Sequence, residues 1–454
     1  MERPTAGPTI DWDAFARSLD GIQVFSDPRV VRAKSKVYYW YSPVLKRLLD
    51  DKTGDLVVVQ KSEEDVVRVA RACVQRRVPL TVRGAGTGNY GQAIPLHGGV
   101  VLDVMRLKRI LWIRNGAARV QAGVKLLTLD AEARRQGWEL RMFPSTKRTA
   151  TVGGFIAGGS GGVGSITYGM LAHPGNLSAL RVVTLEDEPR VLELRGDDVL
   201  KVHHAYGTNG IIVELEFPLA PASSWIDLII AFDDFMAAAR FSQALGEDDG
   251  IVKKLITTIA WPIPRYFTRL VPPVPGGRHA VFLMIAEQSL EPLEGFCREY
   301  GGTICHRRPS DDMGRDIPLY EYTWNHTTMH ALKVDPSITY LQSLFPAGRN
   351  LELVEHMYRH FGDEVLLHLE TIRFEGKVTQ TALQLVRFST EERLNEIIAY
   401  HESQGVLIFN PHTYILEDGG MKTVDDNQLA FKRLVDPHGL MNPGKMRGWW
   451  EQRP

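Results

Sequence analysis

A glycine-rich loop at residues 83–91 constrains the fold of this chain more than any other stretch. It reads Arg-Gly-Ala-Gly-Thr-Gly-Asn-Tyr-Gly and follows the strand-like run Pro79–Val82. Each glycine costs roughly 0.5–1 kcal/mol of extra chain entropy relative to alanine, so such a cluster indicates a backbone that must turn sharply or approach a ligand closely. The ligand that most often needs this is an anionic group held by backbone N–H groups.

The loop does not fit a nicotinamide-nucleotide turn. Gly86-x-Gly88-x-x-Gly91 matches that fingerprint literally, but the residues after Gly91 predict a strand where the fingerprint requires a helix. A second glycine run at 153–164 contains Gly159-x-Gly161-x-x-Gly164 and also lacks a clear following helix. Two such loops suggest one diphosphate held from two sides.

The pattern along the chain predicts a mixed α/β organisation in four parts. A helical lead-in is expected at 1–50, and strands and helices alternate over 51–222, where Ser62–Asp65 reads as a capping box. A second domain is expected over 223–420, with strands near 280–286, 364–374 and 406–409. The Gly/Pro-rich segment 421–454 is predicted to return to the first domain.

Composition narrows the class of protein. The net charge of -1 gives no reason to expect nucleic acid, and no uncharged apolar run is long enough for a membrane span. Small molecules are therefore the expected partners, and a cytoplasmic location is predicted. Three cysteines without metal spacing, Cys73, Cys297 and Cys305, favour buried thiols over a disulfide framework or zinc site.

Four motifs in a fixed order resemble the vanillyl-alcohol oxidase and p-cresol methylhydroxylase superfamily of FAD-linked oxidoreductases. The likeness is nearest to the non-covalent branch around glycolate and D-lactate dehydrogenases and covers residues 51–222. The motifs are Arg83–Gly88, Thr151–Gly154 with the glycine run up to Tyr168-Gly169, Gly207–Ile211, and Leu440–Lys445. The resemblance implies an α+β fold, with a two-lobed FAD-binding domain of p-cresol methylhydroxylase type (PCMH-type) and an α+β cap, or substrate, domain containing an antiparallel sheet.

The resemblance also implies which residues hold FAD. The first loop would hold the diphosphate, the 151–164 loop would wrap its other side, and Ile211 would lie near the adenine and ribose. Lys445, with Asn442, would lie near the flavin, or else be a solvated lysine of the tail. The full set of expected cofactor-binding residues is Arg83, Gly84, Ala85, Gly86, Thr87, Gly88, Asn89, Pro144, Thr151, Gly153, Gly154, Ala157, Gly158, Gly161, Gly162, Gly164, Tyr168, Gly210, Ile211, Asn442 and Lys445.

Two departures from the family pattern shape the prediction. Members with covalently attached FAD have His at the position of Thr87, and doubly linked members have Cys at that of Thr149, so we predict non-covalent FAD. The Gly-Asp-Gly-Asn-x-His segment of the metal-assisted members is absent, and its strand corresponds to 367–374. His368 and Glu370 would share a face there, but a cross-strand polar pair is the commoner outcome, so no metal is predicted.

Candidate catalytic groups gather in the second domain. We predict His412 as the base and Tyr414 as the residue that orients the substrate hydroxyl, because both would lie on one face of an extended segment. Arg373 is a candidate for a bidentate contact with a substrate carboxylate, and His368 for substrate binding. His326 and His330, at i and i+4, would share a helical face and suit a metal, an anionic substrate or a polar domain interface.

These observations favour an FAD-dependent oxidoreductase that transfers a hydride from a small CH–OH substrate to flavin N5. A 2-hydroxy acid is the lead, and oxygen or another acceptor would reoxidise the flavin. An aromatic or allylic alcohol is the runner-up substrate. A flavin-dependent synthase or lyase, and a non-catalytic flavin subunit of a complex, are the alternatives from other classes. A homodimer is possible.

Overall fold

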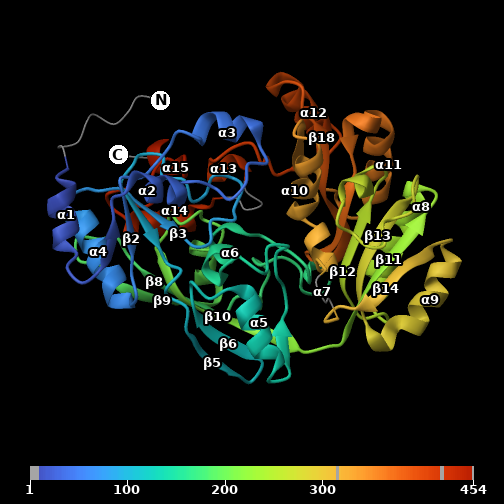
Figure 1. The fold of residues 1–454 in the computed structure, drawn as a ribbon, viewed down its shortest axis with the longest axis horizontal. Helices are drawn as coiled ribbons and strands as arrows, with labels where there is room; N and C mark the ends of the chain where they lie inside the picture. Colours follow the sequence, from blue (N-terminus) through green and yellow to red (C-terminus); the bar gives the residue numbers. More distant parts are fainter. Residues whose placement is uncertain (1–9, 313–315, 420–423, 452–454) are drawn as a thin grey trace.

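The computed structural model describes residues 10–312, 316–419 and 424–451. Two halves lie side by side, one built from the N-terminal half of the chain together with its C-terminal helices, the other from the residues between them (Figure 1). Helices and predominantly antiparallel sheets are mixed throughout, which confirms the predicted α+β class.

The first lobe of the N-terminal half contains a four-stranded sheet in the order β1-β2-β4-β3. β2 and β3 each pair in parallel with β4, so that Leu56 and Leu80 both lie opposite Val100. Four helices belong to this lobe and its surroundings. The bounds are β1 Gln23–Phe25, β2 Leu56–Val59, β3 Leu80–Arg83, β4 Val100–Asp103, α1 Trp12–Ser18, α2 Pro28–Ser35, α3 Pro43–Leu49 and α4 Glu63–Gln75.

The capping signal before α4 is confirmed. The Ser62 hydroxyl accepts a hydrogen bond from the Asp65 amide at 3.1 Å, which satisfies one of the free N–H groups of the first helical turn. Val66, Val69 and Cys73 then form the buried stripe of the helix, so Cys73 is a core residue, as the sequence indicated.

The second lobe is an antiparallel six-stranded sheet, ordered β5-β6-β10-β8-β9, with β7 added to β10. The first glycine loop follows β3 of the first lobe, whereas the second lies within this lobe. Its elements are β5 Ile110–Arg114, β6 Ala117–Gln121, β7 Trp138–Leu140, β8 Ala179–Val183, β9 Val191–Arg195, β10 Ile211–Pro221, α5 Leu126–Arg134, α6 Val152–Gly158 and α7 Ser165–Tyr168.

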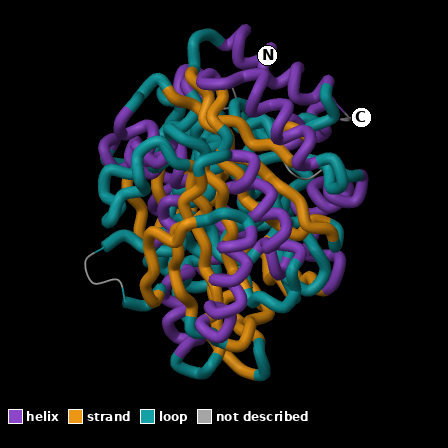
Figure 2. The backbone as a smooth tube through the Cα atoms, turned by 90° about the vertical axis from the view of Figure 1, so that its right-hand side faces the viewer, coloured by secondary structure: helices purple, strands orange, loops and turns teal. Residues whose placement is uncertain are grey.

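The other half, which we call the cap, is organised on one antiparallel nine-stranded sheet in the order β14-β11-β13-β12-β17-β18-β15-β19, with β16 beside β18. Figure 2 looks onto this half and shows its strands running alongside one another. The strands are β11 Trp225–Phe232, β12 Lys253–Ile259, β13 His279–Ala286, β14 Thr303–Pro309, β15 Ile338–Leu344, β16 Val365–Leu366, β17 His368–Phe374, β18 Lys377–Arg387 and β19 Leu407–Ile408.

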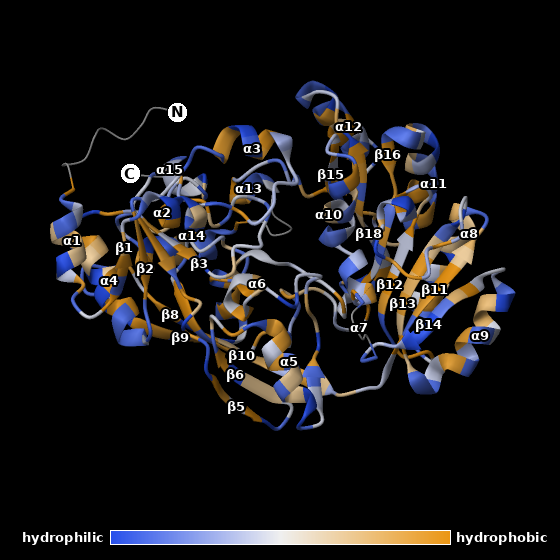
Figure 3. Ribbon diagram, viewed as in Figure 1, coloured by the Kyte–Doolittle hydropathy of each residue, from blue (hydrophilic) through white to orange (hydrophobic). Residues whose placement is uncertain are grey.

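Helices cover the cap sheet, and their apolar faces turn toward it while hydrophilic residues face outward (Figure 3). The chain then returns to the first lobe, where the Asn442 amide donates to the Leu80 carbonyl at 2.7 Å beside β3. The helices are α8 Phe235–Glu247, α9 Leu290–Glu299, α10 Asn325–Val334, α11 Asn350–Phe361, α12 Glu391–Ser403, α13 Leu416–Gly419, α14 Asp426–Val435 and α15 Gly448–Glu451.

Candidate active site

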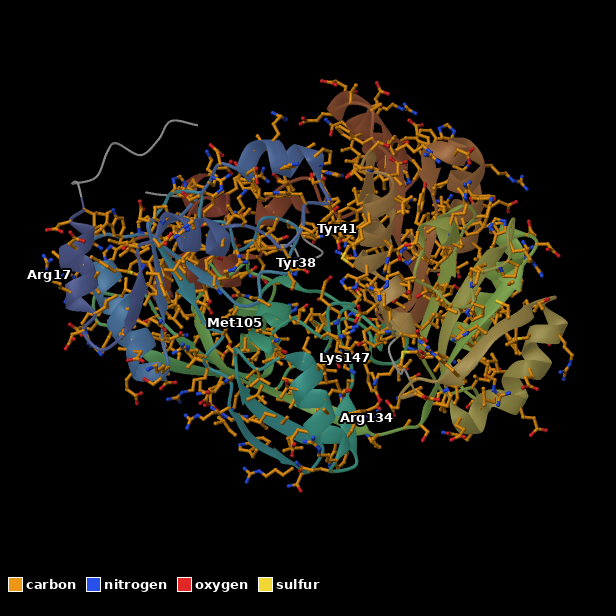
Figure 4. All side chains as sticks on the ribbon, viewed as in Figure 1. Arg17, Tyr38, Tyr41, Met105, Arg134 and Lys147 are labelled. Carbon is orange, nitrogen blue, oxygen red and sulfur yellow. The ribbon has the colours of Figure 1, made fainter. Side chains whose placement is uncertain are left out.

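One large cavity is enclosed by the two glycine loops and continues to the cap. Tyr41 lies in its wall, and Figure 4 labels this residue where the two halves meet. Most of the cofactor-binding residues predicted from the sequence lie in its lining. These are Gly84, Ala85, Gly86, Thr87, Gly88, Asn89, Pro144, Thr151, Gly153, Gly154, Ala157, Gly158, Gly161 and Gly210.

The first loop presents unused backbone donors to this cavity. Within the part of the chain that the structure describes, none of the amides of residues 84–88 donates a hydrogen bond to another protein group. Gly86 has φ +71°, and an added Cβ there would lie 2.1 Å from the Arg83 guanidinium, so the turn requires glycine. A run of consecutive amides facing a cavity is the donor set that a diphosphate needs.

Arg83 supports the loop from beneath. Its guanidinium donates to the Lys36 carbonyl at 2.6 Å, and the residue is buried outside the cavity lining. Burial lowers its pKa, although Asp103 acts in the opposite direction. Arg83 therefore fixes the path of the loop and does not itself face the cavity.

The second glycine run begins with helix α6, which the sequence did not predict because glycine is a poor helix former. The Thr151 hydroxyl caps the helix by accepting from the Gly154 amide at 3.2 Å. An added Cβ on Gly153 would lie 2.7 Å from the Cβ of Ala122, so glycine lets α6 pack closely against the chain that follows β6. Close packing thus outweighs the low helix propensity.

Gly162 and Gly164 have a structural role outside the cavity lining. An added Cβ on Gly162 would lie 2.2 Å from the Phe143 carbonyl oxygen, and one on Gly164 would lie 2.0 Å from the Arg141 carbonyl oxygen. Tyr168 is likewise outside the lining, with the Arg141 guanidinium 5.3 Å from its ring centre. Ile211, at the start of β10, is fully buried against the core of the first lobe.

Asn442 and Lys445 lie behind the first loop, not in the cavity lining. The Asn442 amide group donates to the carbonyls of Gln92 at 2.7 Å and Tyr206 at 2.6 Å. The Lys445 amine donates to the Gly91 carbonyl at 2.7 Å, and its burial lowers its pKa to about 7. Lys445 is fully buried, so it is not a solvated lysine of the tail.

The cap completes the cavity with residues that the sequence analysis did not single out for the site. They are Trp324 and Asn325 at the start of α10, Gln342 from β15, and Thr381 and Leu383 from β18. Gln342 lies opposite Leu383 through the pairing of β15 with β18, and α10 packs against both strands. No local signal in the sequence marks them as neighbours.

A chain of polar side chains crosses from the first loop to the cap. The Tyr90 hydroxyl bonds to the Gln342 carbonyl oxygen, and the Gln342 amide donates to Asn325 at 3.2 Å. Asn325 in turn donates to Asn89 at 3.4 Å, and Asn89 donates to the Tyr340 hydroxyl at 2.9 Å. Burial raises the pKa of the Tyr90 and Tyr340 phenols, so both stay protonated.

His412 does not lie in the cavity lining, in contrast to its predicted role as a base. One ring nitrogen bonds to the Ser42 hydroxyl at 2.8 Å and the other to the Tyr340 carbonyl at 2.9 Å. Burial lowers its pKa to about 4. Tyr414 lies beside it in the sequence, in a loop and not in an extended strand, with its ring 5.1 Å from the Lys445 amine.

His368 and Glu370 share a face of β17, as the two-residue period predicted, and bond to each other at 2.8 Å. The Glu370 carboxylate also accepts from the Thr257 hydroxyl and from the Trp324 amide, both at 2.6 Å. The pair therefore holds Trp324, which does line the cavity. Arg373 lies outside the lining, where it pairs with Asp249 at 3.0 Å.

His326 and His330 do share a face of α10, as their spacing predicted. His330 bonds to the Glu321 carbonyl at 3.1 Å and stacks on Tyr322 with 4.6 Å between ring centres. Burial lowers the pKa of His326 to about 3 and that of His330 to about 4. Across the described ranges, no group of three His, Cys, Asp or Glu side chains could hold a metal ion.

The two lobes around the glycine-walled cavity contain a match to a flavin-binding family. Residues 54–191 match the family model described as FAD binding domain. The chain thus carries a domain of this family, which confirms the resemblance that the motifs indicated. The free amides of residues 84–88 fit the diphosphate of FAD.

Curated relatives match part of the chain. The glycolate oxidase subunit GlcD of Escherichia coli K12 is 33% identical over 200 residues, which are 42% of this chain and 39% of that protein. The D-lactate dehydrogenase of Anaerostipes hadrus is 33% identical over 193 residues, 40% of this chain and 39% of that protein. The matches span about two fifths of these relatives' own length.

Solved structures extend the likeness of fold to nearly the whole chain. A structure of alkyldihydroxyacetonephosphate synthase superposes with a TM-score of 0.73 and 16% identity, covering 98% of this chain and 86% of that one. A variant of the Physcomitrella patens BBE-like 1 protein superposes with a TM-score of 0.67 and 14% identity, covering 94% of this chain and 98% of that one. At these identities the likeness concerns the fold.

None of the helices in the described ranges combines the length and the apolar character needed to cross a membrane.

Proposed function

We propose that the protein is an FAD-dependent oxidoreductase that oxidises a CH–OH group of a small substrate, with a 2-hydroxy acid as the leading class. The observation that carries this proposal is the cavity itself, which runs from unpaired loop amides to a polar face of the cap. Bound FAD supplies the hydride acceptor. The names of the matched relatives support a hydroxy acid.

The chain's own residues hold the cofactor and orient the substrate. The amides of residues 84–88 and the α6 loop hold the cofactor, while Asn442 and Lys445 fix the carbonyls behind the first loop. The cap covers the far end of the cavity, where the Gln342 amide, held by the protonated Tyr90 phenol, orients polar groups of the substrate.

Non-covalent FAD is part of the proposal. Thr87 occupies the lining position where covalently linked relatives have histidine, and a threonine hydroxyl is a poor nucleophile toward a flavin. Thr149 is exposed and outside the lining. Oxygen or another acceptor would reoxidise the flavin, and a cytoplasmic homodimer stays a prediction.

The lining also favours a second candidate, an aromatic or allylic alcohol oxidase or dehydrogenase. Tyr41, Tyr90 and Trp324 line the cavity together, and large aromatic side chains bind planar apolar groups well. The two candidates differ in substrate and share the cofactor chemistry.

Anaerobic mixing tests both candidates. The FAD-loaded protein is mixed with glycolate, D-lactate, benzyl alcohol and cinnamyl alcohol, and flavin absorbance is followed. Bleaching by a hydroxy acid supports the leading class, and bleaching by the alcohols alone supports the second. No bleaching with any of the four would contradict oxidation of a small CH–OH substrate and favour a synthase, a lyase or a non-catalytic flavin subunit. Return of colour in air identifies oxygen as an acceptor.

A further inference from the structure

A tight turn at residues 144–147 contributes three consecutive residues to the wall of the cavity. Pro144, Ser145 and Thr146 line the cavity, and the Lys147 amide closes the turn by donating to the Pro144 carbonyl at 2.9 Å. Lys147 itself and the preceding Phe143 are outside the lining. The position of this part of the wall therefore depends on how two residues behind it are fixed.

The backbone anchors the turn at both ends. The Phe143 amide donates to the Val163 carbonyl at 3.0 Å, and the Val163 amide donates to the Phe143 carbonyl at 2.9 Å. At the other end, the Lys147 carbonyl accepts from the Leu127 amide of α5 at 3.0 Å. These bonds attach the turn to two different parts of the second lobe.

The Lys147 side chain connects the two anchors. Its ammonium donates to Asp130 Oδ2 on α5 at 2.6 Å and lies 4.2 Å from the centre of the Phe143 ring. A cation this close to the face of a ring is attracted by it. The other carboxylate oxygen of Asp130 accepts from the Leu140 amide at 2.8 Å, so the carboxylate is itself fixed. One ammonium thus joins the residue before the turn to helix α5.

This ion pair is both buried and charged. The side chains of Lys147 and Asp130 are only 11% and 7% exposed. Burial acts to raise the pKa of the Asp130 carboxyl, but the Lys147 charge and the Leu140 amide outweigh it and leave this pKa below its ordinary value. Buried ion pairs add little stability over apolar side chains of the same size, and selecting one arrangement of the chain is their best-attested use.

The turn also lies against the cap. The Lys147 ammonium is 5.7 Å from the centre of the Tyr320 ring, and the Phe143 and Tyr320 rings meet edge to face at 5.2 Å. Arg148 pairs with Glu321 at 3.5 Å. Figure 4 labels Lys147 where the two halves meet. A shift of the turn would therefore change the wall of the cavity at the contact between the halves.

We propose that Lys147, held by Asp130, is a positioning residue that places the wall formed by residues 144–146 against the bound cofactor and so sets the affinity for FAD. Neither side chain lines the cavity, so both act through the turn. Residues that support a binding site from behind decide how accurately its contacts are placed. The inference rests on the cofactor of the proposed function and is independent of the substrate.

Lys147→Met tests the role of the ammonium, because it removes the charge and keeps an unbranched side chain. Titration of the apoprotein with FAD measures affinity, and urea unfolding of the apoprotein measures stability. We expect K147M to bind FAD about ten-fold more weakly, the effect of losing the equivalent of one hydrogen bond to the cofactor. It should also be less stable, because the buried Asp130 carboxylate is left unpaired. Lys147→Arg, which keeps a cation for Asp130, should recover most of the FAD affinity.

The double variant D130L/K147M separates positioning from stability. It leaves no unpaired buried charge, so its unfolding free energy should recover toward that of the wild type. Its FAD affinity should stay as weak as that of K147M, because nothing then joins the turn to α5 through the side chain. An FAD affinity that recovers together with the stability would show a merely structural role and would overturn the proposal.

Glu139→Gln is the matched control. Glu139 and Lys254 form another buried ion pair, which neither lines the cavity nor belongs to the turn. E139Q should lose stability and keep the FAD affinity of the wild type. Equal FAD affinity of K147M and wild type, or an equal loss of affinity in K147M and E139Q, would overturn the positioning role.

Anaerobic mixing with glycolate and D-lactate keeps this test apart from that of the proposed function. Wild-type protein that binds FAD but is reduced by no CH–OH substrate would contradict the proposed oxidation, while the weaker FAD binding of K147M and D130L/K147M would still support the positioning role. Wild-type protein that binds no FAD would overturn both.

Discussion

Replacing Glu139 by Gln should destabilise the protein strongly, because this carboxylate joins the two halves from a buried position. Glu139 on β7 bonds to the Lys254 ammonium of β12 and to the Arg134 guanidinium, and it accepts from the indole of Trp225 at 2.9 Å. Arg134 is labelled in Figure 4 near the segment between β10 and β11 that connects the halves. The side chains of Glu139 and Lys254 are only 2% and 4% exposed.

The expected loss of unfolding free energy in E139Q follows from this burial. The E139Q variant removes the negative charge and leaves the buried Lys254 ammonium with neutral acceptors, among them the Leu140 carbonyl at 2.8 Å. Removing one partner of a buried ion pair costs about 3–5 kcal/mol, since the other charge stays desolvated and unpaired. A surface pair is worth only about 0–1 kcal/mol. Glu352, whose side chain is 66% exposed in its pair with Arg349, provides the matched control.

Urea unfolding followed by tryptophan fluorescence measures both variants. We expect E139Q to lose about 3–5 kcal/mol of unfolding free energy and E352Q less than about 1 kcal/mol. The double variant E139L/K254M should lose less than E139Q, because no buried charge is then left unpaired. A loss for E139Q no larger than that for E352Q would refute the reasoning.

Two further predictions follow from shifted pKa values. Burial lowers the pKa of Lys445 to about 7 from 10.5, so between these pH values the unfolded chain binds a proton that the folded chain does not. The unfolding free energy of the wild type should therefore rise with pH relative to that of K445M. Urea unfolding of both proteins at pH 7 and pH 9 measures this change, and an equal change of unfolding free energy in the two proteins would contradict the prediction. Burial likewise lowers the pKa of His412 to about 4 from 6.5, so the wild type should lose stability as pH falls through this window and H412Q should lose less. Above pH 6.5, the rate of flavin reduction should depend on pH in the same way in H412Q and in the wild type. A pH-dependent change of rate that is present in the wild type and lost in H412Q would support His412 as the base.

Local signals in the sequence identified much of the cofactor side. Consecutive glycines, the Ser62 cap and the two-residue period that pairs His368 with Glu370 all act over a few residues, and the structure shows each of them. These features depend on backbone conformation and periodicity, which the sequence carries directly. They therefore required no knowledge of the tertiary fold.

The residues that the cap contributes to the cavity could not be predicted from such local signals. Trp324 and Gln342 become neighbours of the glycine loop only through packing between the halves, and nothing in their own segments indicates it. His412 was singled out for its chemistry, but burial against Ser42 and Tyr340 decides its role. Helix α6 forms despite its glycines, because Gly153 packs against Ala122.

The central claim is that the cavity between the glycine loops binds FAD, and a cavity-filling variant tests it most directly. An added Cβ on Gly158 meets only the Gln92 side chain, at 3.5 Å, so Gly158→Leu should fill the cavity without straining the backbone. Gly276 has nothing within 4 Å of such a Cβ and lies outside the lining, so Gly276→Leu is the matched control.

The measurement is the FAD content and affinity of the three proteins, by absorbance and by titration of the apoprotein. We predict one FAD per chain in wild type and G276L, released into solution on denaturation, and at least a ten-fold weaker affinity in G158L at unchanged folding. Wild-type protein that binds no FAD, or G158L that binds it as tightly as wild type, would contradict the account.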